Sequence, residues 1–354
     1  SRAHRDGRNV GEEFLQGIVN HSTSESERTL ARVAREAAAQ RLYNKSAFMA
    51  QAEALREIKH GIGGDSSRAL AEWGKAARLK AYNNEDARKL MYPVLEAIGT
   101  DGDPRVAALG DVGRKASGAY LYQDSGSIVQ AVALSKVLEA PVGPTLETDL
   151  ADYGRRALNH CGTAQDQRNV GHEVLRGIKK YAQDPANAVL AKVADEATCP
   201  RLYHRGAAGA HYEAFALLEE GNHADADDLV ARFGLAVLGR NDAASDRRTI
   251  VGEVLKSLAE GSSDEVKEAV LRTTLEAAER AGQDSVALGL QKFALNWVRK
   301  APTLPKGQLE GGDELDPAVL EQRLAYNQSV RNQLGDEIKK NQDEVTARTS
   351  RMGA

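Results

Sequence analysis

Hydrophobic residues recur along this chain with the spacing of an amphipathic helix, and the whole pattern returns every 80 residues. In each of four segments, three apolar residues stand four positions apart, and a fourth follows the middle one directly. These residues are Val10, Phe14, Leu15 and Ile18; Leu90, Val94, Leu95 and Ile98; Val170, Val174, Leu175 and Ile178; and Ile250, Val254, Leu255 and Leu258. Such spacing makes one apolar face on a helix. A fixed period of this length indicates a repeat array, in which each unit packs against its neighbours.

Further helices are expected in the rest of each 80-residue block. The pattern places a second helix at 29–38, 104–117, 186–197 and 264–278, and a third at 45–58, 125–138, 205–218 and 285–298. A fourth helix carries an aromatic residue followed by glycine, at Trp73-Gly74, Tyr153-Gly154 and Phe233-Gly234. Because glycine lets helices approach closely while the ring fills the remaining gap, these rings are expected in the core. The fourth block lacks this last helix.

Two charged residues keep the same period. An aspartate stands at Asp6, Asp86, Asp166 and Asp246, and an arginine follows two residues later at Arg8, Arg88, Arg168 and Arg248. The aspartates are predicted to be N-caps, since a carboxylate accepts hydrogen bonds from the first N–H groups of a helix. Two interpretations of the arginines stay open. They tie adjacent repeats together, or they form a row of candidate partner-binding residues.

The segment Gly102-Asp-Pro-Arg-Val-Ala-Ala-Leu-Gly110 resembles the second-helix signature of HEAT repeats, a family of helix pairs of about 40 residues. Two such pairs fill one 80-residue block. The resemblance implies an all-α fold, a right-handed superhelical α-solenoid of about seven HEAT-like helix pairs over residues 1–300. It also implies a scaffold that grips a partner protein along its surface. It carries over no catalytic or binding residues.

Residues 301–316 are rich in proline and glycine and are expected to be a linker. A long amphipathic helix is predicted for 317–350, because Asp316-Pro317 is a helix start and apolar residues follow a thin seven-residue rhythm. Packing along the array, a coiled coil that makes a homo-oligomer or holds a partner, and a solvated helix all stay open for it. Residues 351–354 are a short tail.

Composition narrows the classes of function. Aromatic residues are only 5% of the chain, so its core is expected to consist mainly of Ala, Leu and Val. The formal net charge of −4 does not favour a nucleic-acid partner. No apolar run is long enough for a membrane span, and the first residues are not a signal peptide. Because a repeat begins almost at residue 1, we expect an upstream part that held any targeting signal. Both the bacterial cytoplasm and secretion into a host stay open as locations.

Little in the sequence indicates catalysis. The chain offers no specific catalytic constellation, so we predict a protein that is not an enzyme and needs no cofactor. Cys161 and Cys199, with His160 and His204 nearby, are the one cluster of metal-ligand residue types; a metal site, a disulfide and simple packing stay open. We therefore predict a non-enzymatic protein-binding scaffold, of which a secreted bacterial effector is one version. The alternative is a structural component that assembles through its C-terminal helix.

Overall fold

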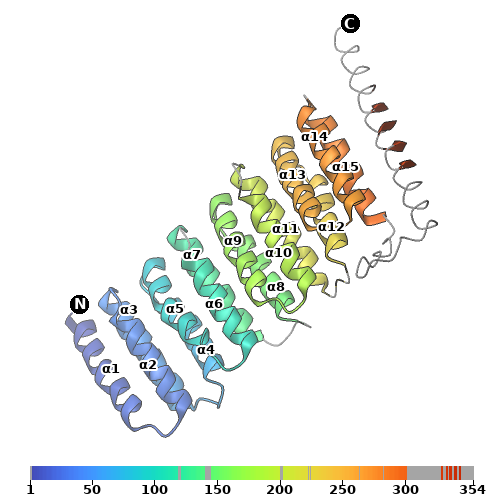
Figure 1. The fold of residues 1–354 in the computed structure, drawn as a ribbon. Helices are drawn as coiled ribbons and strands as arrows, with labels where there is room; N and C mark the ends of the chain where they lie inside the picture. The colour runs from blue at the N-terminus through green and yellow to red at the C-terminus, as the bar shows by residue number, and fades with distance from the viewer. Residues whose placement is uncertain are drawn as a thin grey trace, which may run out of the picture. The chain divides into compact units, whose positions relative to one another are not determined.

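The computed structural model describes residues 2–118, 121–139, 145–199, 202–221, 223, 225–262, 264–281 and 283–300, with single positions between 328 and 343. Over these residues the fold is all-α, with fifteen long helices and no strand (Figure 1). The helices are α1 (Arg2–His21), α2 (Glu25–Ala39), α3 (Asn44–His60), α4 (Ser66–Lys80), α5 (Asn84–Ile98), α6 (Pro104–Gly118), α7 (Gln123–Glu139), α8 (Leu146–His160), α9 (Ala164–Tyr181), α10 (Pro185–Thr198), α11 (His204–Glu220), α12 (Ala226–Leu238), α13 (Ala244–Gly261), α14 (Glu265–Arg280) and α15 (Asp284–Lys300).

The 80-residue period appears directly in the helix order. Helices α5, α9 and α13 begin at Asn84, Ala164 and Ala244, 80 residues apart, and each opens a block. The first three blocks hold four helices each, and the fourth holds α13, α14 and α15 among the described residues. The predicted helices of every block are confirmed within a few residues at each end.

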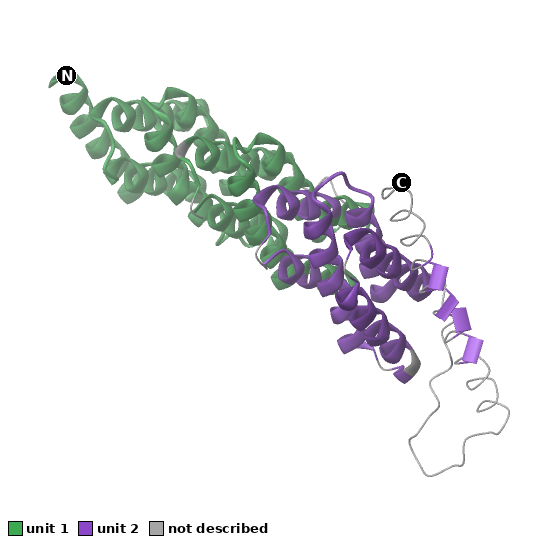
Figure 2. Cartoon of the chain, turned by 90° about the horizontal axis from the view of Figure 1, so that it is seen from above, with its two compact units in different colours: residues 1–191, 214–222 green, residues 192–213, 223–354 purple. Residues whose placement is uncertain are grey.

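The chain divides into two compact units, coloured separately in Figure 2. Unit 1 comprises residues 1–191 and 214–222, and unit 2 comprises residues 192–213 and 223–354. In unit 1 each helix from α1 to α8 contacts the next one along the chain, and α2, α4 and α6 also contact the helix three places on. In unit 2, α12 contacts α13 and α15, and α14 contacts both α13 and α15.

The core is built as the aromatic–glycine pairs predict. Trp73, Tyr153 and Phe233 are fully buried, and the Trp73 indole N–H donates to the Ala50 carbonyl at 3.0 Å. A Cβ added to Gly154 would lie 2.8 Å from the Phe215 ring, closer than side-chain atoms normally approach. Most other buried side chains are Ala, Leu and Val. Small residues thus allow the close helix packing that stabilises the blocks.

The prediction that the periodic aspartates are N-caps is wrong. The caps of α5 and α9 are Asn83 and Thr163, whose side chains accept from the backbone N–H of Asp86 and Asp166. Asp246 likewise lies inside the first turn of α13, and α1 already begins at Arg2. The capping residue stands three positions before the aspartate, so the aspartate side chain is left for other partners.

The linker at 301–316 and most of the predicted helix at 317–350 lie outside the described residues, as does the tail at 351–354. The single described positions between 328 and 343 are helical. None of the described helices is long and apolar enough to cross a membrane.

Candidate interaction surface

The buried aspartate of α5 holds the neighbouring helix α3 by its first turn. Asp86 Oδ2 accepts from the Ser46 hydroxyl at 2.5 Å and from the Tyr43 backbone N–H at 3.2 Å. Ser46 Oγ in turn accepts from the backbone N–H of Tyr82, just before α5, at 2.9 Å. Asp86 and Ser46 are both almost fully buried. The side chain of Tyr43, the N-cap of α3, makes no capping hydrogen bond. The Asp86 carboxylate of α5 instead accepts hydrogen bonds from the first turn of α3.

The same arrangement returns one block later, where α9 meets α7. Asp166 accepts from the Ser125 hydroxyl at 2.6 Å and from the Tyr122 backbone N–H at 3.3 Å. Ser125 Oγ accepts from the Gly162 backbone N–H at 3.2 Å. The periodic aspartate is therefore a tie between the first turns of two helices. We call each Asp–Ser pair with its two backbone N–H groups an aspartate tie.

In unit 2 the periodic aspartate is Asp246, and no serine hydroxyl lies at the position equivalent to Ser46 and Ser125. Burial raises the pKa of Asp246, and the nearby Asp242 adds to the rise, while a hydrogen bond from the Tyr203 backbone opposes it. The position of the serine is taken by Gly206, where an added Cβ would lie within 3.0 Å of the Asp246 carboxylate carbon. A hydroxyl that would stabilise the charged form of Asp246 is thus missing, and no aspartate tie forms here.

The two ties hold the backbones of three exposed tyrosines. Tyr43, Tyr82 and Tyr122 are 60%, 60% and 65% exposed, although their backbone N–H groups are all engaged in the ties. They precede α3, α5 and α7, so they share the edge of unit 1 at which these helices begin. We call these three residues the tyrosine edge. In unit 2, Tyr203 precedes α11 in the same way and is 74% exposed.

The side chains along the tyrosine edge are of mixed character. The rings of Tyr43 and Tyr82 lie 5.0 Å apart, and Lys45 Nζ lies 5.9 Å from the centre of the Tyr82 ring. The Asn84 amide reaches across to Asp124, near Tyr122. Exposed aromatic rings beside charged groups of both signs make a surface suited to polypeptide and ill suited to a polyanion.

The arginine row lies half-buried between helices of the same block. Arg8 donates to the Ala38 carbonyl at the end of α2 (2.8 Å) and to Asn44 Oδ1 at the start of α3 (3.3 Å). Arg248 does the same in α13, with the Ala278 carbonyl at 2.7 Å and Asp284 at 3.1 Å. Arg88 packs its stem against Gly126, and Arg168 is half-buried as well. Arg8 and Arg248 therefore bind the carbonyl end of one helix to the start of the next. Partner binding by the four arginines stays a prediction.

Cys161 is buried and Cys199 is exposed, and both are free thiols. Neither cysteine forms a disulfide, and Cys161 lies in unit 1 while Cys199 lies in unit 2. Burial, with the charge of Asp166, raises the pKa of the Cys161 thiol to about 12, which keeps it from acting as a thiolate.

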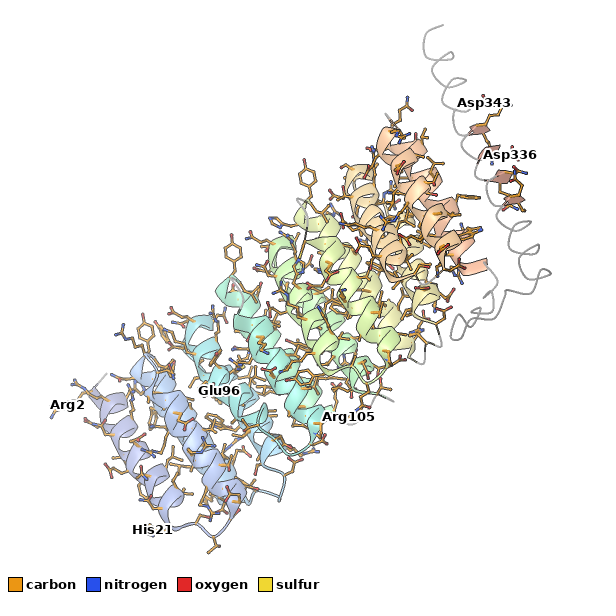
Figure 3. The ribbon with its side chains drawn as sticks, in the orientation of Figure 1. Arg2, His21, Glu96, Arg105, Asp336 and Asp343 are labelled. Atoms are coloured by element: carbon orange, nitrogen blue, oxygen red, sulfur yellow. The ribbon has the colours of Figure 1, made fainter. Side chains whose placement is uncertain are left out.

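Unit 1 also holds a buried group of charges. Lys136 Nζ lies 3.3 Å from Asp149 and 2.8 Å from Asp152, and Arg105, labelled in Figure 3 at the start of α6, also pairs with Asp149. Burial opposes ionisation of Asp152, but hydrogen bonds from Lys136 and Arg156 keep its pKa below the ordinary value. These ion pairs link α6 and α7 to α8.

The tyrosine edge was not predicted, although the sequence contains a signal for it. The dipeptide Leu-Tyr occurs at 42–43, 121–122 and 202–203, close to the 80-residue period. In each case the tyrosine is exposed, while the leucine is buried or half-buried.

Comparison with protein-family models, with curated proteins and with solved structures gave no match to this chain. The chemistry of its own surface is therefore the ground for a functional proposal.

Proposed function

We propose that this protein is a non-enzymatic protein-binding scaffold that holds a partner polypeptide along the tyrosine edge. In this proposal the helix pairs continue as a right-handed superhelical solenoid of about seven HEAT-like pairs. A solenoid presents equivalent positions of successive repeats in a row. The tyrosine edge is then the binding surface of unit 1, and Tyr203 is the equivalent exposed residue of unit 2.

The observation that carries the proposal is the combination of a fixed backbone with an exposed ring. An exposed tyrosine ordinarily loses side-chain and backbone freedom when it binds. At Tyr43, Tyr82 and Tyr122 the backbone is already held by the aspartate ties, so only ring rotations remain to be ordered. Tyrosine is enriched at protein interfaces because it offers a large contact area and a hydroxyl at little cost in conformational entropy.

Site-specific photo-crosslinking tests the proposal. A photoreactive phenylalanine analogue is placed at Tyr122 in the full chain, and at His60 in a matched control. His60 is exposed at the end of α3, and α3 begins at the tyrosine edge, so His60 lies at the opposite end of the helix. The proposal expects one polypeptide to be captured from position 122 and not from position 60 in cells that produce the protein. Equal capture from both positions would show that contacts are non-specific and would contradict it.

The same experiment separates the alternative function. If the polypeptide captured from position 122 is a second copy of the chain, and light scattering shows an oligomer, then assembly replaces partner binding as the conclusion. Substitution of Arg8, Arg88, Arg168 and Arg248 by glutamate tests whether the arginine row binds the partner. Since Arg8 and Arg248 bind helix ends, we expect that variant to lose stability before it loses any partner specifically.

A further inference from the structure

Three exposed cations stand beside the first two tyrosines of the tyrosine edge. Arg41 and Lys45 stand two residues before and two residues after Tyr43. Lys80 stands two residues before Tyr82. None of the three cations forms an ion pair with an acidic side chain among the described residues. We call Arg41, Lys45 and Lys80 the cationic rim. A chain with a formal net charge of −4 thus carries a local group of positive charges at this surface.

Other cations on the same helices are neutralised within the chain. Arg68 of α4 pairs with Glu72 at 3.2 Å, and Lys89 of α5 pairs with Glu85 at 2.6 Å. Lys89 Nζ also donates to the Arg41 carbonyl at 3.0 Å, which holds the backbone of Arg41 beside α5. The charges of the cationic rim, in contrast, stay available to carboxylates from outside the chain.

Apolar side chains are exposed beside the cationic rim. The rings of Tyr43 and Tyr82 lie 5.0 Å apart, and Lys45 Nζ lies 5.9 Å from the centre of the Tyr82 ring. Leu79, in the last turn of α4 and next to Lys80, is 77% exposed. An apolar centre with a charged rim is the usual arrangement of a protein interface. A lysine ammonium has three N–H donors, so Lys45 can face a ring and still donate to a carboxylate.

The sign of the charge changes further along the tyrosine edge. Asp124, two residues after Tyr122, and Glu85, three residues after Tyr82, are both exposed. A nucleic acid carries a phosphate at every nucleotide, so it would meet these carboxylates on the way from Tyr82 to Tyr122. A polypeptide can place its acids opposite the cationic rim alone. The charge pattern therefore favours a polypeptide with a local acidic segment.

We propose that the cationic rim, together with Tyr43, Tyr82 and Leu79, binds a segment of the partner in which acidic residues flank an aromatic or aliphatic residue. The apolar residue of that segment packs on the two tyrosine rings and on Leu79, and its carboxylates pair with the cationic rim. This inference rests on the proposed scaffold function and adds the chemistry of the segment that the tyrosine edge holds.

Three fluorescent probes test the inference on the full chain, with binding followed by anisotropy at about 50 mM salt, where ion pairs are little screened. The acidic probe is a peptide of three Glu-Asp-Trp-Gly units. The neutral probe is a peptide of three Gln-Asn-Trp-Gly units, which has the same length and the same aromatic content. The third probe is an oligothymidylate of the same number of units.

A pair of charge-reversal variants shows where the acidic probe binds. Lys45→Glu with Lys80→Glu reverses most of the cationic rim. Lys59→Glu with Lys179→Glu is the matched control, because it changes the net charge by the same amount at exposed positions. These two control positions lie in the last turns of α3 and α9, whose first turns are joined to the tyrosine edge by the aspartate ties. Circular dichroism checks that both variants keep their helices.

We expect the acidic probe to bind with a dissociation constant on the order of 10–100 μM, and the neutral probe to bind at least about tenfold more weakly. Reversal of the cationic rim should weaken binding of the acidic probe by about tenfold or more, and the control should change it by less than about twofold. Equal binding of the two peptides, unchanged binding after rim reversal, or no binding at about millimolar peptide would overturn the inference. Tighter binding of the oligothymidylate that is lost on rim reversal would overturn it too, because the ligand would then be a nucleic acid.

The variant Tyr43→Ala with Tyr82→Ala separates this inference from the proposed function. It should weaken binding of both peptides, since both carry an aromatic residue for the tyrosine rings. If the tyrosine variant weakens both peptides equally and rim reversal weakens neither, the acidic segment is refuted and the scaffold proposal stands. If rim reversal alone weakens binding, the tyrosines do not hold the polypeptide, and the proposed function fails with the inference.

Discussion

Removing the carboxylate at Asp166 isolates the contribution of an aspartate tie. In Asp166→Ala the Ser125 hydroxyl loses its acceptor and the Tyr122 backbone N–H loses its partner across the repeat. Because Asp166 and Ser125 are 1% and 3% exposed, water does not easily replace the lost oxygen atoms.

The expected loss follows from those two hydrogen bonds. A hydrogen bond to a charged group contributes about 1.5–3 kcal/mol, and a buried N–H left without an acceptor costs about 1–3 kcal/mol. Relief of the desolvation of the carboxylate offsets part of the sum. We therefore expect Asp166→Ala to lower the free energy of unfolding by about 2–4 kcal/mol. A double-mutant cycle with Ser125→Ala should show a coupling of about 1–2 kcal/mol.

Urea denaturation followed by circular dichroism measures the change, and the chain offers a matched control. Asp6 stands at the same position of the first block, but its side chain is 66% exposed and its ion pair with Arg2 is 4.0 Å long. Asp6→Ala should therefore change the free energy of unfolding by no more than about 0.5 kcal/mol. Equal losses for Asp6→Ala and Asp166→Ala would refute the tie and indicate that these aspartates act only through local helix propensity.

Three more predictions concern stability, each measured by denaturant unfolding. Gly154→Val should lower the free energy of unfolding by about 2–3 kcal/mol, since the valine side chain would meet the Phe215 ring. Gly17 has open space around it, so Gly17→Ala should raise the free energy of unfolding by about 0.5–1 kcal/mol. Similar effects at both glycines would contradict the role of Gly154 in helix packing. Lys136→Met should lower the free energy of unfolding by about 3–5 kcal/mol. The pKa of Asp152 is lowered in the folded chain, so its ionised form stabilises the fold at neutral pH and this contribution is lost as pH falls; the variant should therefore lose less stability on acidification. An unchanged dependence of stability on acid pH would contradict the pairing. The pKa of Asp246 is raised in the folded chain, so its contribution to the free energy of unfolding should fall as pH rises from 3.8 through the pKa of the folded state. Asp246→Asn should abolish this pH dependence. A contribution that rises with pH would show a stabilised carboxylate instead.

The helices were predictable because their cause is local. The spacing of Val170, Val174 and Ile178 already defines the apolar face of α9, and the return of that spacing 80 residues later identifies the next block. The burial of Trp73 beside Gly74 was predictable for the same reason, since a large ring next to a missing side chain has few other uses in a helix.

The role of the aspartates was not predictable from spacing alone. Asp166 is the third residue of α9, and Thr163, just before the helix, is also a residue type that caps helices. Spacing alone therefore does not show which of the two caps α9. The acceptors and donors of the tie lie about 40 residues apart in the chain, so they become visible only once α7 and α9 are packed. The exposure of Tyr122 follows from the same tertiary contact.

Affinity for the polypeptide captured from position 122 tests the scaffold proposal most directly. Isothermal titration compares the unmodified chain with the variant Tyr43→Ala, Tyr82→Ala and Tyr122→Ala, and with a control that carries the exposed positions His60→Ala and Tyr92→Ala. Each buried interface tyrosine is worth about 2 kcal/mol, so the loss of all three should weaken binding by about 10⁴-fold while the control keeps its affinity. Unchanged affinity in the triple variant, with its helix content intact, would contradict the claim that the tyrosine edge holds the partner.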